Sequence, residues 1–170
     1  MGIYFLKGGI YMEVGFYSGS FDPFTIGHLH VLKQALRICD KVIIGIGTNS
    51  DKKRRFDKDL MKEAIEKVLA HENISNVTVI TYEGLTFKAA LDNNATLLLR
   101  GVRNNGTDYP YEESLAAKNK EYSGLDTIYI RACEYGTVSS SGVMELLKYG
   151  MDVSKYLPKD VLNAVMKSKV

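Results

Sequence analysis

Residues 19–28 read Gly19-Ser20-Phe21-Asp22-Pro23-Phe24-Thr25-Ile26-Gly27-His28 and join an apolar run at residues 12–17 to an amphipathic run at residues 26–39. This arrangement predicts a strand, a glycine turn and a helix, and the free backbone N–H groups at such a helix start bind phosphate well. Gly19 lets the backbone approach a ligand closely. His28 falls in the first helical turn, where its ring can reach the same anion. The stretch therefore predicts a nucleotide site.

Neither of the two common phosphate-binding motifs occurs in the chain. A P-loop ends in Gly-Lys-Ser/Thr, and no such tripeptide is present. A dinucleotide-binding turn needs Gly-x-Gly-x-x-Gly after the first strand, where the chain reads Gly15-Phe16-Tyr17-Ser18-Gly19-Ser20. The simpler interpretation is that Ser20 and His28 only cap a helix, but ten residues in a strand–turn–helix context favour a binding site.

Apolar runs of strand length alternate with helical patterns along the chain. The continuous apolar runs at residues 42–44 and 97–99 are typical of strands covered on both faces. The expected strands are residues 13–18, 41–48, 76–82, 96–100 and 127–131, and the expected helices are residues 26–39, 57–70, 85–91, 109–122, 138–149 and 153–166. The alternation predicts an α/β fold, as a single-domain, Rossmann-like, five-stranded parallel sheet with helices on both faces and further helices at the C-terminus.

Polar or glycine-rich clusters follow each expected strand. They are residues 19–28, 49–56, 84–86, 101–105 and 133–141. Ligands of open parallel sheets bind outside the carboxyl ends of the strands, near the point where the strand order reverses. We therefore expect these clusters to meet at one end of the sheet and to form the site.

The composition is that of an ordinary globular protein. Of the 170 residues, 45% are hydrophobic and 25% are charged, and the net charge of +2 does not suggest a nucleic-acid partner. Cys39 and Cys133 match neither a disulfide scaffold nor a zinc motif, and they suit a reducing cytoplasm. No apolar stretch is long enough to span a membrane, so we expect a cytoplasmic protein without a membrane partner.

The pattern Gly-Ser-Phe-Asp-Pro followed by Thr-Ile-Gly-His resembles the signature of the nucleotidyltransferase superfamily. The Thr-x-Gly-His form is typical of bacterial phosphopantetheine adenylyltransferases, and the resemblance covers nearly all of residues 12–168 through several motifs in the same order. It implies adenylyl transfer from ATP to 4′-phosphopantetheine, giving dephospho-CoA and pyrophosphate in coenzyme A biosynthesis. Residues 12–170 would then form the nucleotidyltransferase domain, and residues 1–11 an N-terminal extension.

The cationic run Lys52-Lys53-Arg54-Arg55 follows the second expected strand. Taken alone it would be a solvated loop, but lysine supplies the compact charge that phosphate substrates need. By resemblance, Lys52 binds the substrate phosphate. Arg54 and Arg55 depart from the family pattern, which usually has Pro and a small or apolar residue there, and no role is assigned to them.

The run Arg100-Gly101-Val102-Arg103 lies where a buried strand ends and resembles the Arg-Gly-x-Arg of the family. Guanidinium donors match phosphate oxygens in pairs. The resemblance implies that Arg100 holds the pantetheine phosphate and that the other three residues contact ATP. The alternative is a structural ion pair with Asp108 or Glu112.

Two further elements resemble ATP-binding parts of the family. Residues 108–112 resemble Asp-Phe/Tyr-x-Tyr-Glu, with Asp108 as a helix N-cap and Glu112 as an ATP contact. The run Tyr135-Gly136-Thr137-Val138-Ser139-Ser140-Ser141 resembles a helix start at which Ser139 is the N-cap, the serines bind an anion and the aromatic ring packs against adenine. The family often has a cation three residues after the serines, where this chain has Met144. Candidates to replace it are Arg54, Arg55 and Arg131.

The implied reaction needs no general base, because the attacking phosphate is already ionised at neutral pH. The site has to place that phosphate in line with the α-phosphorus of ATP and to stabilise the developing charge. The expected catalytic residues are His28, as a transition-state stabiliser, Lys52 and Arg103. The expected substrate-binding residues are Ser20, Lys52, Thr86 and Arg100. The expected ATP-binding residues are Ser20, Phe21, His28, Gly101, Val102, Arg103, Glu112, Tyr135, Gly136, Thr137, Val138, Ser139, Ser140 and Ser141. Mg²⁺ is the expected cofactor, carried by the nucleotide phosphates and water rather than by protein ligands.

Two other functions fit parts of the sequence. A nicotinamide mononucleotide adenylyltransferase or a CTP-using enzyme of the same superfamily shares the first motif, although Thr25 stands where most of these have a first His. A non-catalytic nucleotide-binding protein is the third candidate, and the intact His28, Lys52 and two arginines argue against it. The resemblance also implies a homohexamer and inhibition by coenzyme A, which the residues themselves do not indicate.

Overall fold

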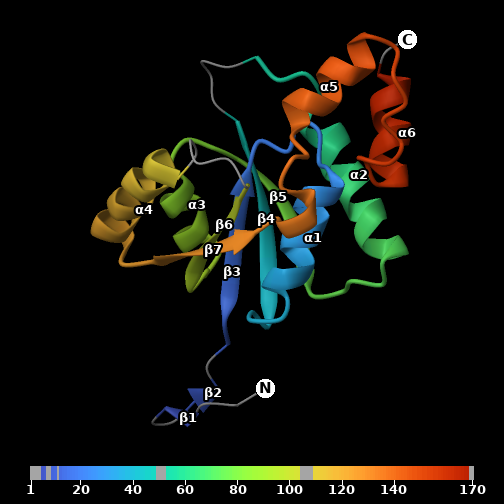
Figure 1. The fold of residues 1–170 in the computed structure, drawn as a ribbon. Helices are drawn as coiled ribbons and strands as arrows, with labels where there is room; N and C mark the ends of the chain where they lie inside the picture. Colours follow the sequence, from blue (N-terminus) through green and yellow to red (C-terminus); the bar gives the residue numbers. More distant parts are fainter. Residues whose placement is uncertain (1–4, 7–8, 11, 49–52, 104–108, 169–170) are drawn as a thin grey trace.

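Five parallel strands form the sheet of the computed structural model, which describes residues 5–6, 9–10, 12–48, 53–103 and 109–168. In chain order the strands are β3 (Val14–Gly19), β4 (Lys41–Thr48), β5 (Val77–Glu83), β6 (Leu97–Val102) and β7 (Asp126–Arg131). Across the sheet the order is β5-β4-β3-β6-β7, so the chain builds outward from β3 in one direction and then returns to build in the other (Figure 1). The expected five-stranded parallel α/β fold is confirmed.

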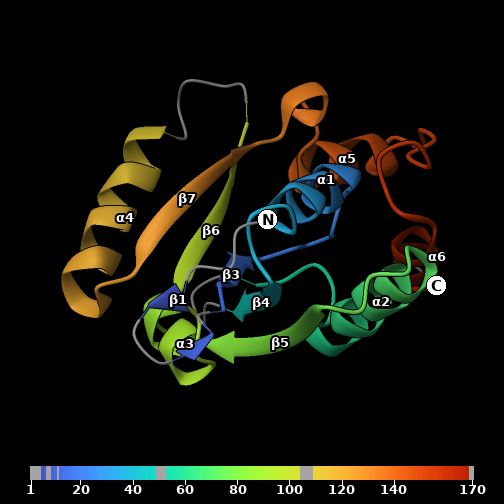
Figure 2. The ribbon, with the colours of Figure 1, turned by 90° about the horizontal axis from the view of Figure 1, so that it is seen from below.

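Helices cover both faces of this sheet (Figure 2). One face carries α1 (Ile26–Ala35), α2 (Lys58–His71), α5 (Ser140–Lys148) and α6 (Lys159–Lys167), and the other carries α3 (Thr86–Asp92) and α4 (Tyr109–Ser123). A short 3-10 helix, η1 (Cys133–Tyr135), follows β7. Right-handed crossovers explain this division, because the chain crosses the sheet in opposite directions before and after β5. In the part of the chain that the structure describes, no helix has the length and apolar character needed to cross a membrane.

Alternate residues of each strand face two different cores. Tyr17, Val42 and Ile44 pack into a larger cluster with α1, α2 and α6, whereas Phe16 and Ile43 pack into a smaller cluster with α3. Because both faces are buried, the strands read as continuous apolar runs. The two cores therefore hold the strand ends at fixed positions.

Two short strands precede the sheet. β1 (Phe5–Leu6) and β2 (Gly9–Ile10) form an antiparallel pair that is separate from the five-stranded sheet (Figure 1). The division into an extension at residues 1–11 and a domain at residues 12–170 stays a prediction.

The last helix begins later than expected, whereas the other helices begin within two residues of their expected starts. Residues 153–166 were expected to be helical, but α6 begins at Lys159. Pro158 lacks an N–H group and disfavours helical backbone in the residue before it, so it occupies the N-cap and the helix starts after it. The first helix is also shorter than expected and ends at Ala35, because residues 36–38 form a turn.

Gly45 of β4 lies against the Phe16 ring, where the sheet leaves no room for a side chain. A Cβ atom at this position would overlap that ring and would lie 3.0 Å from Cε1 of Tyr82. We expect Gly45→Ala to lower the free energy of unfolding by about 2 kcal/mol through overpacking, as measured by urea unfolding. Combining it with Phe16→Leu, which removes the ring atoms concerned, should cost less than the sum of the two single losses. If the loss of unfolding free energy in the double variant equals the sum of the two single losses, Gly45 does not pack against the Phe16 ring as described.

Candidate active site

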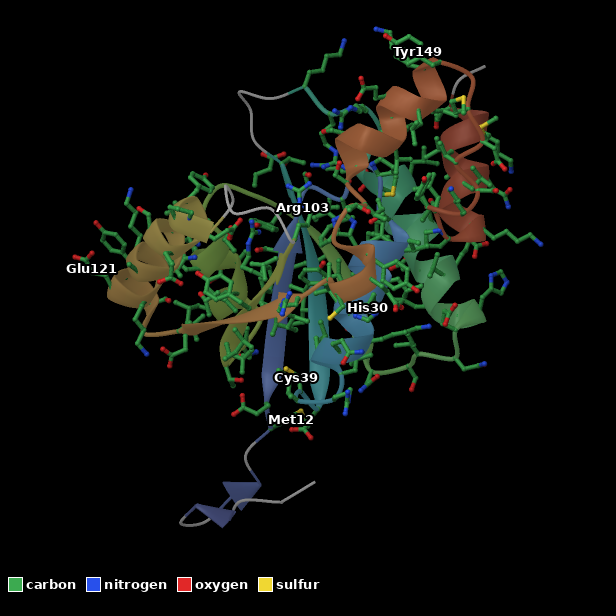
Figure 3. The ribbon with its side chains drawn as sticks, in the orientation of Figure 1. Met12, His30, Cys39, Arg103, Glu121 and Tyr149 are labelled. Atoms are coloured by element: carbon green, nitrogen blue, oxygen red, sulfur yellow. The ribbon has the colours of Figure 1, made fainter. Side chains whose placement is uncertain are left out.

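A cavity of about 410 Å³ opens at the carboxyl ends of β3 and β6. These strands are neighbours in the sheet but not in the chain, so the cavity lies where the strand order reverses, as expected for a parallel sheet. Its walls come from the two strand ends, the loop between β3 and α1, and the first turns of α1, α4 and α5. Figure 3 shows Arg103 at this end of the sheet and Met12 and Cys39 at the opposite end. The volume suits a small-molecule ligand.

Thr25 and His28 form a reciprocal cap at the start of α1. Oγ1 of Thr25 accepts a hydrogen bond from the backbone N–H of His28 at 3.3 Å, and the backbone N–H of Thr25 donates to Nδ1 of His28 at 3.0 Å. Because Nδ1 accepts, the neutral imidazole carries its proton on Nε2. His28 therefore does cap its helix, as the simpler interpretation of the sequence has it. Its ring also lines the cavity, where Nε2–H is the donor left for a ligand.

The surroundings of His28 favour the neutral imidazole. Desolvation of the ring, followed by the positive charges of Arg103 and Arg100, lowers the pKa of His28 from 6.5 to about 4. The rings of Phe21 and Phe24 pack against the imidazole, with centroids 5.0 and 5.5 Å away. An anion bound beside His28 would oppose the two arginine charges and raise the pKa again.

Arg100 is held at the end of β6 by an ion pair with Glu112. Nε and Nη2 of Arg100 donate to the two carboxylate oxygens at 2.8 and 2.6 Å, and Nη1 donates to the backbone oxygen of Ser18 at 2.9 Å. The ion pair that the sequence left as an alternative is therefore present, and both partners line the cavity. The guanidinium has five N–H groups and keeps a donor for a further acceptor.

The first turn of α5 forms another wall of the cavity. Ser139 is its N-cap, as expected, because Oγ accepts from the backbone N–H of Gly142 at 3.0 Å. Oγ of Ser140 donates to the backbone oxygen of Pro23 at 2.7 Å and links the turn to the loop after β3. These two hydroxyls serve the local structure, whereas the backbone N–H groups of Ser140 and Ser141 have no acceptor within the helix. The turn thus offers main-chain donors to an anion.

Asp22, Arg54 and Arg55 fasten the loop after β3 to the segment after β4. The carboxylate oxygens of Asp22 accept backbone N–H groups, from Arg55 at 2.8 Å and from Phe56 at 3.0 Å. Arg54 donates to the backbone oxygen of Ser20 at 2.7 Å, and Arg55 donates to that of Asp22 at 3.0 Å. The two arginines without an assigned role therefore position a wall of the cavity.

A second cavity, of about 10 Å³, shares three lining residues with the first, namely Ser18, Arg100 and Glu112. Thr86, at the start of α3, lines only this smaller cavity. Its Oγ1 lies 2.8 Å from the hydroxyl of Tyr82 in a hydrogen bond. The predicted substrate residue Thr86 is therefore placed on the α3 side of Arg100.

Most of the predicted site residues line the larger cavity. They are Ser20, Phe21, His28, Arg100, Gly101, Arg103, Glu112, Val138, Ser139, Ser140 and Ser141. The cavity wall does not include Val102, Tyr135, Gly136 or Thr137. The Tyr135 ring packs against His30, with 5.1 Å between the ring centroids. Lys52 and Asp108 lie outside the described residues, so their roles stay predictions.

Tyr17 and Ser18 line the cavity although the sequence did not single them out. Both belong to β3, whose apolar pattern indicates core residues. Only the place of Ser18 near the carboxyl end of a strand signals a site residue. Desolvation raises the pKa of the Tyr17 phenol well above its usual range, against the opposing charge of Arg100, so the hydroxyl stays neutral.

Two carboxylates that the structure describes around the cavity, Glu112 and Asp22, already accept hydrogen bonds from the protein. Glu112 accepts from Arg100, and Asp22 accepts from two backbone N–H groups. Within the described ranges, no group of three or more His, Cys, Asp or Glu side chains could hold a metal ion.

Known proteins resemble this chain over most of its length. The family model described as Cytidylyltransferase-like matches residues 16–145. A phosphopantetheine adenylyltransferase from Porphyromonas gingivalis is 40% identical over 148 residues, which are 86% of this chain and 95% of that protein. One from Phocaeicola vulgatus is 40% identical over 149 residues, or 87% and 97% of the two chains. One from Streptococcus pneumoniae is 38% identical over 160 residues, or 92% and 97%.

Solved structures share the fold at low sequence identity. A putative nicotinate-nucleotide adenylyltransferase from Vibrio parahaemolyticus has a TM-score of 0.65 at 16% identity and covers 92% of this chain and 99% of its own. A bifunctional NMN adenylyltransferase/ADP ribose pyrophosphatase from Francisella tularensis has a TM-score of 0.66 at 16% identity, over 94% of this chain and 54% of its own. These two show the fold alone. The family model and the more similar relatives show that the chain belongs to the cytidylyltransferase-like family and, within it, to the phosphopantetheine adenylyltransferases.

Proposed function

We propose that the protein transfers the adenylyl group of ATP to 4′-phosphopantetheine and so makes dephospho-CoA and pyrophosphate for coenzyme A biosynthesis. The observation that carries the proposal is the cavity between the ends of β3 and β6, where His28, Arg100, Arg103 and the first turn of α5 come together. These groups suit a triphosphate and a second phosphate bound side by side. Relatives that are 36–40% identical carry the name of this activity.

The attacking group is a phosphate monoester that is ionised at neutral pH. One of its oxygens bonds to the α-phosphorus of ATP while the bond to the oxygen bridging the β-phosphorus breaks, and pyrophosphate leaves with that electron pair. The protein has to align the two anions and stabilise the charge that develops. A neutral His28 suits this task, because Nε2–H can donate to an α-phosphate oxygen without giving up its proton.

The other residues divide between the two phosphates. Arg100, with Ser20 and Lys52, holds the attacking phosphate, and Arg103 with the first turn of α5 holds the leaving pyrophosphate. The ion pair with Glu112 supports the role of Arg100, because it fixes the guanidinium at the strand end. The place of Thr86 beside Arg100 supports a pantetheine arm on the α3 side.

Mg²⁺ belongs to the proposal as a cofactor bound through the nucleotide. Because Glu112 and Asp22 already accept hydrogen bonds from the protein, phosphate oxygens and water would supply its ligands. When bound, the cation neutralises charge on the leaving pyrophosphate.

A nicotinamide mononucleotide adenylyltransferase is the second candidate. Its support is the shared first sequence motif, since the solved NMN adenylyltransferase/ADP ribose pyrophosphatase with this fold is 16% identical to the chain and shows the fold alone. A non-catalytic nucleotide-binding protein is the third candidate. The convergence of His28 with both arginines in one cavity argues against it.

The proposal extends to a homohexamer, inhibition by coenzyme A and a cytoplasmic location. The family resemblance supports the first two, and the two cysteines, which match no disulfide scaffold, support the third. Light scattering of the full chain tests the assembly, and a monomer at micromolar concentration would exclude the hexamer.

A pyrophosphate-release assay distinguishes the three candidate functions. With ATP and Mg²⁺, 4′-phosphopantetheine should support turnover and nicotinamide mononucleotide should not, because the space on the α3 side of Arg100 is proposed to take the pantetheine arm. Turnover with nicotinamide mononucleotide alone would favour the second candidate. Turnover with neither acceptor would favour the non-catalytic protein.

His28→Ala should lower kcat by about 10²–10³ and change KM little, because the lost donor acts on charge that develops in the transition state. Steady-state kinetics with both substrates measure the two parameters. His28→Gln is the matched variant, since its amide can still donate, and it should keep more activity than His28→Ala. Thermal unfolding of both variants separates loss of the helix cap from loss of the donor. Turnover near that of the wild type in His28→Ala would show that the assigned role is wrong.

Stability should fall with acid in a way that depends on His28. The folded-state pKa is about 4 and the ordinary value is 6.5, so between these pH values the unfolded chain binds a proton that the folded chain does not. The contribution of neutral His28 to the free energy of unfolding is therefore complete above pH 6.5 and is lost as the pH falls to 4. It amounts to about 3 kcal/mol. Urea unfolding should show a smaller acid loss in His28→Ala than in the wild type. An NMR titration that gives His28 a pKa near 6.5 in the free protein would refute the expectation.

A further inference from the structure

We infer that Arg55 binds the terminal phosphates of ATP at the edge of the cavity. The guanidinium extends from the segment after β4 to the first turn of α5. There Nη2 donates to Oγ of Ser141 at 3.2 Å, while Nη1 donates to the backbone oxygen of Asp22 at 3.0 Å. Ser141 is a lining residue of the cavity. The inference rests on the proposed function, because it assigns a further residue to the nucleotide of that reaction.

The charge of Arg55 is not balanced by a carboxylate among the described residues. The nearby carboxylate of Asp22 accepts the backbone N–H groups of Arg55 and Phe56. Among the described residues, the Arg55 guanidinium bonds to a carbonyl and a hydroxyl. Both of these acceptors are neutral. With five N–H groups, the guanidinium also retains enough donors to bind a phosphate through two hydrogen bonds.

The first turn of α5, to which Arg55 bonds, also suits a phosphate ligand. The first turn of α5 presents the backbone N–H groups of Ser140 and Ser141, which have no acceptor within the helix. A pyrophosphate group at this turn would lie beside the Arg55 guanidinium, because Ser141 contacts both the cavity and that guanidinium. Arg55 and the helix start thus form two sides of one anion site.

The other candidate cations are less suited to this place. Arg54 is only 15% exposed as a side chain, donates to the backbone oxygens of Ser20 and Phe56, and has Nη2 3.8 Å from the Asp22 carboxylate. Neither Arg131 nor Arg55 is itself part of the cavity wall, but the Arg55 guanidinium donates to Ser141, which is. Met144, at the position where the family often has a cation, packs against the larger core. Of the three arginines that the sequence offers as substitutes, Arg55 is the one in contact with the serine turn.

Binding of ATP, pyrophosphate and AMP to the full-length protein tests the inference by calorimetry. Arg55→Gln should lower the affinities for ATP and pyrophosphate about tenfold, which is the scale of one lost charge-assisted hydrogen bond. The affinity for AMP should change by less than about twofold, because AMP lacks the terminal phosphates. Arg37→Gln is the matched control. Arg37 is also exposed and also bonds a neutral acceptor, but that acceptor, the side chain of Gln34, is not part of the cavity wall, whereas Ser141 is. It should change none of the three affinities.

Each other outcome has a definite meaning. If Arg55→Gln lowers the affinities for ATP and AMP equally, Arg55 acts only by holding the loop between β3 and α1. If the affinity for ATP does not change, Arg55 does not contact the nucleotide. Either result would overturn the inference. Arg55→Lys, which keeps the charge, should recover part of the affinity for ATP if the inference holds. In the steady state, Arg55→Gln should raise the KM for ATP and not that for 4′-phosphopantetheine. If the wild type releases no pyrophosphate from ATP and 4′-phosphopantetheine, the proposed function fails, while the comparison of ATP with AMP still decides the role of Arg55.

Discussion

The place of β3 at the centre of the parallel sheet is the constraint on which the rest of the structure depends. Its neighbours β4 and β6 belong to halves of the fold that build in opposite directions. The helices after β3 and β6 therefore leave on opposite faces, and the space between their first turns is the cavity. Phe16 and Tyr17 anchor β3 in the two cores, so the loop that leads to α1, the helix of His28, starts from a fixed point.

Around Arg100 and His28, the cavity favours anions through oriented donors more than through exposed charge. The charge of Arg100 is balanced by Glu112, and His28 is neutral because desolvation and the two arginines lower its pKa. Paired and neutral groups cost less to desolvate than isolated cations, so the site can be assembled before a ligand arrives. The negative charge of a bound phosphate would then oppose the two arginine charges and raise the pKa of His28.

Local patterns in the sequence predicted most elements, because strand and helix periodicities depend on near neighbours. They were wrong where the apolar pattern continued through Pro158 and suggested a helix from residue 153, although proline excludes that start. They also offered Arg54 and Arg55 as substitutes for the missing cation without deciding between them. The contacts of both arginines with the loop after β3 join residues more than thirty positions apart, and periodicity contains no information on which loops meet.

The sequence by itself determined the alternating fold, the strand–turn–helix at residues 19–28 and the clusters at the strand ends, because each is written in short runs of residue types. Only the tertiary structure decided what those residues are able to do. It placed the Thr25 N–H on Nδ1 of His28, paired Arg100 with Glu112 and brought Arg55 to Ser141. The physical reason is that tautomer, pKa and ion pairing depend on distances and on solvent exclusion. Both are set by packing between segments that lie far apart in the chain.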